Sequence, residues 1–348
     1  VLRTIAPQLV WPLTLMIPIY RGDPRSRWKI AAGLTLYDLL ALHRTLGAHT
    51  VLSGRDPLRQ EAALRRDGLR AAGTYVDCQM DDARLCLANV LQAIGFGAVC
   101  CNYVRCLALK KTQGTVCGAV VEDARTLQTF EIDAAVVVNA TGPWSDAVRR
   151  LSDHAASTRL APTKGIHLVV RRLTAHALFA QARQDRRMIF VLPWGEYSLI
   201  GTTESSDVGN LDALQASAHD VEYLLGEVAC LLPDAALTEH DIVATYAGAR
   251  PLLAFSGSSS GASREHRLEI DRHGLISVMG GKYTTYRAMA QQTVDLVVKR
   301  LRRQTERCLT DQVSLLEPTH PVVLHRWQDV TRRVDPSLLQ RLLSVYGT

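Results

Sequence analysis

Two short stretches, 136–146 (VVVNATGPWSD) and 275–287 (LISVMGGKYTTYR), constrain the fold more than any other part of the chain. In each, an apolar run typical of a buried strand ends in small residues and then passes into a helical pattern. Open α/β sheets bind cofactors just beyond the carboxyl ends of their strands, where small residues let a ligand approach the backbone. Two such junctions predict a mixed α/β and α+β protein that binds a cofactor.

The second junction has the chemistry of an anion cradle. Gly280 and Gly281 carry no Cβ, so a flat or phosphorylated ligand can approach the backbone there. A helix start exposes unpaired N–H groups with partial positive charge, and Lys282 adds a mobile cation. Thr284 or Thr285 can cap the helix or donate a hydrogen bond. The motif by itself fits a glycine turn with a solvated lysine equally well.

Composition excludes several classes of protein. The chain has 348 residues, of which 47% are hydrophobic and 21% charged, which predicts one large or two ordinary globular domains. Its net charge of +6 is mild and unclustered, so we predict no nucleic-acid partner. The eight cysteines show no CxxC pair, so neither a metal site nor a disulfide framework is expected. The apolar stretch 9–20 is interrupted by prolines and reads as a buried strand.

Local patterns predict the main elements. Asp81 and Asp82 cap a helix that begins at ARLCLANV, Asp56-Pro57 begins a helix over 57–67, and an amphipathic helix covers 217–231. The Ala/Val run at 134–139 predicts a strand covered on both faces. Further strands are predicted at 98–109, 166–172, 188–194 and 197–203, with a hairpin turn at 272–274.

Three segments carry scattered cations, TKGIH (163–167), AGARPL (247–252) and SREH (263–266). His167 precedes a strand of valines, where a histidine is either a structural residue or a proton acceptor. Arg250 and Arg264 stand near strand ends and suit either forked hydrogen bonds to a phosphate or surface salt bridges. Spacing alone does not decide between these alternatives.

Nine blocks in chain order carry a resemblance to the FAD-dependent, quinone-linked glycerol-3-phosphate dehydrogenase family. They are YDLL (37–40), DDARL (81–85), VVNATGPWSD, KGIH, VLPW (191–194), IGTTE (200–204), YAGARPL, SREH and GGKYTTYR. The likeness runs from the first residues to about Arg303. The family opens with a GxGxxG strand-turn-helix that holds the FAD pyrophosphate. That motif is not in this sequence, so we expect a fragment that also lacks most of the C-terminal domain.

The resemblance implies an incomplete two-domain flavoprotein oxidoreductase fold. It assigns a Rossmann-like FAD-binding domain to 84–152 and 266–303. An antiparallel-sheet substrate domain is assigned to 1–83 and 153–265, and the start of a C-terminal helical domain to 304–348.

The resemblance also implies site residues. Those expected near FAD are Cys106, Ala140, Thr141, Gly142, Pro143, Trp144, Gly280, Gly281, Lys282, Thr284 and Thr285. Those expected near glycerol 3-phosphate are His167, Arg250, Arg264, Lys282 and Thr284. His167, Arg250 and Lys282 are the expected catalytic residues, and His167 is the candidate base because an imidazole ordinarily titrates near neutral pH.

The implied reaction is oxidation of sn-glycerol 3-phosphate to dihydroxyacetone phosphate, with hydride transfer to FAD and electrons passed to quinone. Two alternatives remain open. One is a catalytically incompetent fragment that does not retain FAD. The other is a related FAD oxidase, of glycerol-3-phosphate or amino-acid oxidase type. The resemblance implies a cytoplasmic location, and it allows peripheral attachment to the inner face of the cytoplasmic membrane and a homodimer.

Overall fold

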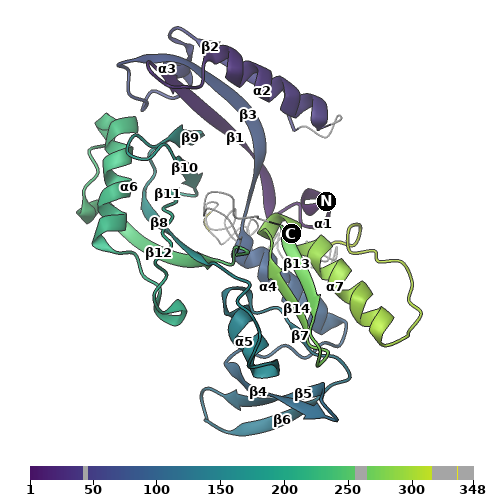
Figure 1. The fold of residues 1–348 in the computed structure, drawn as a ribbon. Helices are drawn as coiled ribbons and strands as arrows, with labels where there is room; N and C mark the ends of the chain where they lie inside the picture. Colours follow the sequence, from purple (N-terminus) through teal and green to yellow (C-terminus); the bar gives the residue numbers. More distant parts are fainter. Residues whose placement is uncertain (42–45, 255–264, 316–334, 336–348) are drawn as a thin grey trace. The chain divides into compact units, whose positions relative to one another are not determined.

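The computed structural model describes residues 1–41, 46–254, 265–315 and 335, arranged as a mixed α/β fold with three sheets (Figure 1). The chain divides into two compact units. The first consists of Val1–Trp11, Cys78–Leu160 and Leu253–Thr348, and the second of Pro12–Asp77 and Ala161–Leu252. The predicted fold class, a mixed α/β protein with an extensive antiparallel sheet, is confirmed.

The second unit is built on an eight-stranded sheet with the order β12-β8-β11-β10-β9-β1-β3-β2. Neighbouring strands from β12 to β9 are antiparallel, whereas β1 joins β9 in parallel, with Leu15 opposite Ala177. The strands are β1 (Val10–Tyr20), β2 (Thr50–Ser53), β3 (Leu69–Met80), β8 (Thr163–Arg171), β9 (Ala177–Gln181), β10 (Met188–Trp194), β11 (Tyr197–Gly201) and β12 (Ile242–Arg250). The stretch 9–20 therefore contains a strand, as predicted, and residues 15–19 of it are buried.

One face of this sheet is covered by helix α6 (Ala218–Leu231), close to the predicted 217–231. Ser217 and Asp220 form a capping box at its start, which satisfies two backbone N–H groups. Ile166 and Leu168 of β8 belong to the core shared with α6. Since side chains alternate along a strand, His167 between them points to the opposite face.

Two further helices lie over the other end of this sheet. Helix α2 (Arg27–Leu40) packs closely on β3, because a Cβ at Gly73 would lie 2.6 Å from Cγ2 of Ile30. Helix α3 (Asp56–Gln60) ends earlier than the predicted 57–67. The chain turns at Glu61, whose buried carboxylate accepts the backbone N–H groups of Ala175 and His176 at 2.9 and 3.1 Å. This tertiary contact outweighs the local helical pattern.

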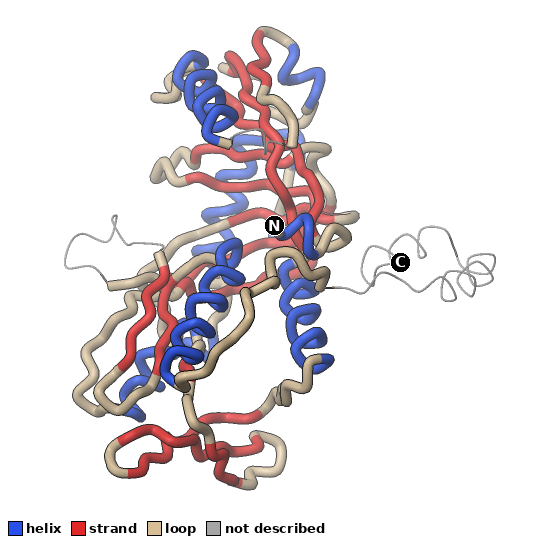
Figure 2. The backbone as a smooth tube through the Cα atoms, turned by 90° about the vertical axis from the view of Figure 1, so that its right-hand side faces the viewer, coloured by secondary structure: helices blue, strands red, loops and turns tan. Residues whose placement is uncertain are grey.

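The first unit contains two three-stranded sheets, with the orders β13-β14-β7 and β4-β5-β6 (Figure 2). Its strands are β4 (Val104–Thr112), β5 (Thr115–Asp123), β6 (Thr129–Asp133), β7 (Val138–Asn139), β13 (His266–Ile270) and β14 (Ile276–Gly280). Its α-helices are α1 (Leu2–Ile5), α4 (Asp82–Gly95), α5 (Ser145–Ser152) and α7 (Tyr286–Arg300). Short 3-10 turns lie at η1 (Gly142–Trp144) and η6 (Tyr283–Thr285), and in the second unit at η2 (Leu211–Ala213), η3 (Pro233–Ala235) and η4 (Glu239–Asp241).

The predicted strand over 134–139 is wrong in extent and in burial. Only Val138 and Asn139 have strand geometry, and both pair in parallel with β14. The side of β7 away from β14 has no partner strand among the described residues. Val138 is therefore 39% exposed, although a strand covered on both faces was expected. The apolar character of this run reflects a surface that the described part of the chain leaves bare.

The described part of 304–348, which is 304–315 and Asp335, contains turns and no helix. The two units do not coincide with the predicted domains, since 1–11 falls in the first unit and the other boundaries differ by several residues. The functions assigned to those domains stay predictions. No helix within the described ranges has the length and apolar composition needed to cross a membrane.

Candidate active site

Strand β8 of the second unit carries His167 at the centre of three paired strands. His167 lies opposite Gly201 of β11 on one side and opposite Tyr246 of β12 on the other. The imidazole and the Tyr246 ring are stacked, with centroids 5.0 Å apart and planes inclined by 24°. This contact restricts the orientation of the imidazole, which lies on the face of the sheet that α6 does not cover.

Two glycines make room for the two candidate functional side chains on this face. A Cβ at Gly201 would lie 2.3 Å from Cδ2 of His167, and a Cβ at Gly165 would lie 2.4 Å from a guanidinium nitrogen of Arg250. Both separations are far shorter than a carbon can tolerate. The imidazole and the guanidinium therefore occupy the spaces that side chains at these two positions would fill.

Two threonines orient Arg250. Its Nη2 donates to Oγ1 of Thr202 at 2.9 Å, and its guanidinium approaches the Thr203 carbonyl at 3.4 to 3.5 Å. The hydroxyl of Thr203 accepts the N–H of Ile166 at 3.2 Å, which ties this turn to β8. Arg250 is only partly buried. A proton acceptor and an oriented cation on one face suit an anionic substrate that must lose a proton.

In the first unit, Asn139 holds the turn that follows β7. Its buried amide donates to the carbonyl and hydroxyl of Ser145, at 3.0 and 3.2 Å, and to the Ser277 hydroxyl of β14 at 3.3 Å. Its carbonyl oxygen accepts the hydroxyl of Thr141 at 2.7 Å and the Thr141 N–H at 3.3 Å. One side chain thus joins the strand end, the turn and the neighbouring strand.

The helix after this turn is fixed by buried charges. Asp146 accepts the backbone N–H groups of Arg159 and Leu160, both at 2.9 Å, and pairs with Arg149 at 2.7 Å. Arg149 also contacts Glu269 of β13 at 3.3 Å. The polar residues at the end of the VVVNATGPWSD motif therefore hold the turn in shape.

The second glycine turn is tightly packed. Gly280 has φ +69° and Gly281 has φ +94°, values that residues with a side chain rarely adopt. A Cβ at Gly280 would lie 2.6 Å from the Glu265 carbonyl oxygen, and one at Gly281 would lie 2.5 Å from the side chain of Met289. Both positions thus require glycine for reasons of packing as well as backbone conformation.

The residues after these glycines are exposed. Neither η6 nor α7 has a side-chain cap, and the Thr285 hydroxyl instead donates to the Lys282 carbonyl at 3.0 Å. The structure gives no partner within the described ranges to the side chains of Lys282 and Thr284. The Tyr283 hydroxyl donates to the Asp82 carbonyl at 2.7 Å, and burial together with nearby acidic groups raises its pKa to about 12. The turn is pinned to α4 by Tyr283, while Lys282 and Thr284 face solvent.

Residues 1–287 match the family described as FAD-dependent oxidoreductase. The chain belongs to the FAD-dependent oxidoreductase family. FAD is thus the cofactor of the family. The two strand–glycine–helix junctions follow the carboxyl ends of β7 and β14, which pair in parallel, and this is where α/β sheets bind their cofactors.

The most similar proteins named below carry a more specific description than the family does. The chain is 35% identical to the glycerol-3-phosphate dehydrogenase of Synechocystis over 100% of its own length and 66% of that protein. The structure of the Bacillus halodurans glycerol-3-phosphate dehydrogenase complexed with FAD superposes with a TM-score of 0.81 at 28% identity, covering 99% of this chain and 64% of that one. The chain therefore spans slightly less than two thirds of these relatives.

A third likeness is limited to the fold. The L-α-glycerophosphate oxidase of Mycoplasma pneumoniae has a TM-score of 0.63 at 14% identity, covering 90% of this chain and 78% of that one. At this identity the likeness shows a shared fold and nothing more.

The junction residues fit part of FAD. A cavity of about 520 Å³ lies beside β7, β14 and α7, and small residues such as Ala140, Gly142 and Gly280 line it at the strand ends. Its remaining lining is almost entirely apolar, with Val138, Val278 and residues of α7. The cavity suits a flat, largely apolar ring close to glycine backbone. Its lining includes no charged side chain that would neutralise a pyrophosphate.

The other predicted FAD residues are more scattered. Thr141 and Trp144 are exposed, Pro143 is partly buried, and all three lie in or beside η1. Cys106 lies in β4, in the other three-stranded sheet, and the strand itself begins at Val104 and not at 98. Burial raises the pKa of the Cys106 thiol, and this thiol donates to the Ala108 carbonyl at 3.6 Å. Arg264 lies outside the described residues.

Several residues that shape these two sites were not predicted from the sequence. They are Asn139, Ser145, Gly165, Gly201, Thr202, Thr203 and Tyr246. The one available signal was that Asn139 is a polar residue directly after a run of valines. The glycines and Tyr246 act through partners on neighbouring strands, and that register cannot be read from a single segment.

Proposed function

We propose that this chain carries the substrate-oxidising machinery of an FAD-dependent glycerol-3-phosphate dehydrogenase. The observation that carries the proposal is the placement of His167 and Arg250 on one face of β8 and β12, each in the space left by a glycine. The Synechocystis relative, which bears the name of this activity, supports the choice of substrate.

In this proposal the imidazole of His167 accepts the proton of the C2 hydroxyl of sn-glycerol 3-phosphate. FAD, when bound, supplies the acceptor for the hydride that leaves C2, so that the product is dihydroxyacetone phosphate. The stacked Tyr246 and the absence of a side chain at Gly201 fix the imidazole, so that it meets the hydroxyl in one orientation.

Arg250 holds the phosphate or the developing ketone oxygen by forked hydrogen bonds, while Thr202 and Thr203 keep its guanidinium on the face that carries His167. Lys282 and Thr284, whose side chains are exposed, and Arg264 complete the proposed substrate set. Binding energy from the phosphate aligns C2 with the base.

For FAD, the proposal assigns the ring system to the turns Ala140–Trp144 and Gly280–Thr285, and the adenine end to the backbone near Cys106. Small residues and glycines at these turns allow close contact with the ring. The unpaired backbone N–H groups at the start of α7 would, with FAD bound at these turns, stabilise negative charge on the reduced cofactor.

The test is spectroscopic. The purified chain is mixed with FAD, freed of excess cofactor and examined for flavin absorbance, and glycerol 3-phosphate is then added without oxygen. The proposal expects flavin bands that bleach on addition of substrate. Bound flavin that does not bleach, with an intact homologous enzyme bleaching beside it, would exclude the activity for this chain.

We further propose quinone as the electron acceptor and attachment to the inner face of the cytoplasmic membrane. Helix α2 supports attachment, because it presents large apolar side chains to solvent beside Arg27 and Lys29, and Trp28 is 72% exposed. The other exposed apolar residues of this helix are Leu36, Tyr37, Leu39 and Leu40. An apolar face flanked by cations suits an anionic lipid surface.

Flotation with vesicles containing phosphatidylglycerol tests the attachment. Trp28→Ser with Leu40→Ser is expected to abolish flotation, whereas Leu127→Ser, at an equally exposed leucine of the first unit, leaves it unchanged. The acceptor is tested by comparing the rates of quinone and oxygen reduction. Fast oxygen reduction without quinone reduction would favour an oxidase, and the predicted homodimer is checked by sedimentation of the same sample.

A second candidate function follows from the bare side of β7. The exposed Val138 and the apolar cavity beside it indicate a surface suited to a further strand and helix. In this second proposal the chain binds substrate but retains FAD only when a segment carrying a GxGxxG turn covers that surface. The expected result is no flavin band from the chain alone and clear bands after such a segment is added in trans. Flavin bands from the chain alone exclude this candidate.

A further inference from the structure

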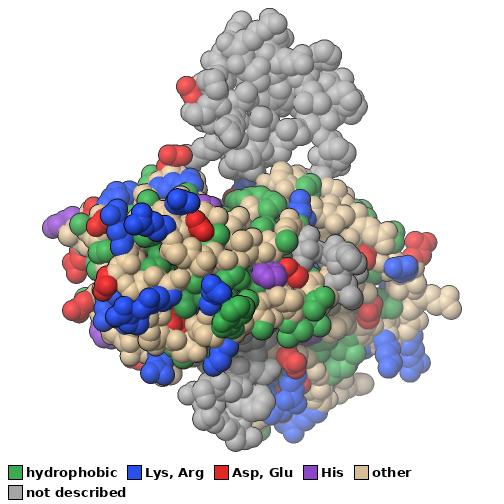
Figure 3. Space-filling view, turned by 90° about the horizontal axis from the view of Figure 1, so that it is seen from above, with side chains coloured by type: hydrophobic (Ala, Val, Ile, Leu, Met, Phe, Trp, Pro, Cys, Tyr) green, Lys and Arg blue, Asp and Glu red, His purple; other side chains and the backbone are tan. Residues whose placement is uncertain are grey.

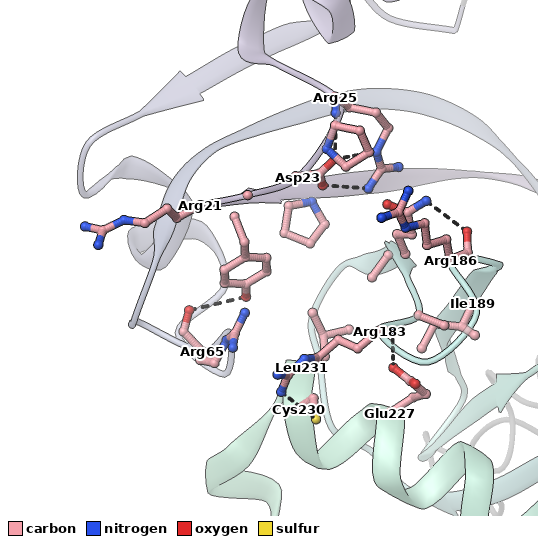
Figure 4. Close-up of a pocket in the computed structure, with 17 residues that line it drawn as sticks. Arg21, Asp23, Arg25, Arg65, Arg183, Arg186, Ile189, Glu227, Cys230 and Leu231 are labelled. Carbon is pink, nitrogen blue, oxygen red and sulfur yellow. Dashed lines mark hydrogen bonds and ion pairs between the residues drawn. The ribbon is translucent and has the colours of Figure 1, made fainter.

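A second polar cavity lies in the second unit, away from His167 and Arg250. It has a volume of about 260 Å³ and lies between the end of β1 with the loop after it, the β9–β10 turn and the last turn of α6 (Figure 4). Its lining includes Ile189, which belongs to the core on the α6 side of the sheet. The cavity is therefore on the opposite face from the His167 and Arg250 side chains.

Five arginines line this cavity, together with only two carboxylates. Both carboxylates are already engaged. Asp23 accepts the Nε and Nη2 groups of Arg25 at 3.0 and 2.9 Å. Glu227 accepts the backbone N–H groups of Arg183 and Gln184 at 2.7 and 3.0 Å. The lining thus carries an excess of positive charge that its own acids do not neutralise.

Arg25 pairs with Asp23, whereas the other four arginines, Arg21, Arg65, Arg183 and Arg186, have no carboxylate partner within the described ranges. The Arg65 guanidinium lies over the Tyr20 ring at 4.3 Å, and its Nε is buried without an acceptor. Arg183 donates to the Cys230 sulfur at 3.3 Å, and sulfur is a weak acceptor. Buried donors without acceptors are rare in native proteins and usually point to an acceptor that binds there.

The close-up shows how these side chains lie. Arg65 and Arg183 extend along one side of the cavity, near Cys230 and Leu231, while Arg25 and Arg186 lie on the other side (Figure 4). The Arg21 side chain points away from them, although Arg21 also lines the cavity. In the space-filling view, Lys and Arg side chains gather on the left of the surface, with some Asp and Glu side chains among them (Figure 3).

We propose that this cavity binds a phosphate group, either as inorganic phosphate or as a small phosphate monoester. A tetrahedral dianion offers several oxygens to guanidinium groups that approach from different sides, which a single planar carboxylate does not. The volume is below the roughly 300 Å³ at which pockets for larger organic ligands begin. Tyr20, Ile189 and Leu231 supply an apolar wall that a short carbon chain can contact.

Calorimetric titration of the whole chain tests the proposal. An Arg250→Met background removes the contribution of the proposed substrate site, so failure of the proposed function and of this site are distinguishable. Inorganic phosphate is expected to bind with one-to-one stoichiometry. Arg65→Gln and Arg183→Gln should each weaken binding by about tenfold or more, because each removes hydrogen bonds to a charged group. Arg21→Gln is the matched control and should leave affinity within about twofold.

Two results would contradict the proposed phosphate site. One is unchanged phosphate binding in the Arg65→Gln, Arg183→Gln double variant, and the other is an equal loss in Arg21→Gln, which would indicate diffuse attraction. The same titration with glycerol 2-phosphate distinguishes inorganic phosphate from a phosphate monoester as the ligand. Equal affinities identify free phosphate as the ligand, and tighter binding of the ester shows that the apolar wall contacts its carbon chain.

A second measurement avoids the variants, should they fail to fold. Cys230 lines the cavity and contacts Arg183, so bound phosphate should slow its alkylation by iodoacetamide. Peptide mass spectrometry follows Cys230 against the exposed Cys100 of the first unit. Slower alkylation of Cys230 alone supports the site, and equal rates with and without phosphate contradict it.

Discussion

The candidate residues of the second unit and those of the first are held by opposite means. His167 and Arg250 occupy spaces that exist because Gly201 and Gly165 have no side chains. The turn after β7 depends instead on a side chain that is present, since Asn139 makes five hydrogen bonds to three neighbouring residues. The first arrangement is sensitive to an added methyl group, and the second to a removed amide.

The largest effect is expected from Gly201→Ala. Its new methyl group would displace the His167 ring, which is short and already stacked on Tyr246. A misplaced catalytic group of this kind can reduce kcat about 100-fold. Steady-state kinetics of the FAD-loaded protein measure the effect. Gly248→Ala is the control, because a Cβ there meets nothing within 4 Å. A similar loss of kcat in both variants would contradict the proposed role of His167 as the base.

In the first unit, Asn139→Ala should lower the free energy of unfolding by about 2 kcal/mol, because it leaves buried partners unsatisfied. Thr141→Val removes only the hydroxyl contact and should cost about 1 kcal/mol. Urea unfolding followed by fluorescence gives both values. If the two substitutions cost the same, Asn139 does not organise the turn.

Gly165→Ala should act more weakly than Gly201→Ala, because Arg250 is long and can move its guanidinium away from a new methyl group. We expect a rise in KM for glycerol 3-phosphate of about tenfold with little change in kcat, as when uniform binding is lost. The same kinetic assay checks it, again beside Gly248→Ala. A fall in kcat at unchanged KM would show that Arg250 serves the chemical step and not anchoring.

The smallest effect concerns the ion pair between Lys164 of β8 and Asp220 of α6, whose charged atoms are 2.8 Å apart. Burial acts to raise the pKa of Asp220, but hydrogen bonds from Lys164 and Ser217 outweigh it and hold the pKa below 3.8. A depressed pKa adds stability above pH 3.8, and that stability is lost as the pH falls through the folded value.

Asp220→Asn should therefore lower the free energy of unfolding by about 1 kcal/mol at pH 7 and by almost nothing near pH 2. Thermal unfolding at a series of pH values measures this trend. Asp207→Asn, at an exposed carboxylate of the same unit, is expected to have little effect at any pH. A difference at Asp220 that stays constant down to pH 2 would contradict the assigned cause.

Much of the fold could be predicted from local signals. The cap at Asp81, the helix over 217–231 and the apolar strand 188–194 appear in the structure at or within one residue of their predicted positions. The helix predicted over 57–67 is shorter in the structure, because Glu61 accepts hydrogen bonds from the backbone N–H groups of Ala175 and His176. The strand over 134–139 was predicted wrongly, since only Val138 and Asn139 pair with β14 and Val138 is 39% exposed.

The candidate sites were less accessible to sequence reasoning. The motifs identified the glycine turns, and the resemblance identified His167 and Arg250. The roles of Gly165 and Gly201 depend on which residues face each other across strands, and that register is a property of the whole sheet. The arginine-lined cavity brings together four separate segments, none of which carries a motif.

The parallel pairing of Leu15 with Ala177 also has a consequence for synthesis on the ribosome. Strands β1 to β3 emerge early, but the strands that complete their sheet are translated only after the central segment of the first unit. Until β9 appears, the nascent chain exposes an apolar strand edge to other chains and to chaperones. Yield in the cell should therefore depend on how quickly the ribosome passes from residue 80 to residue 180.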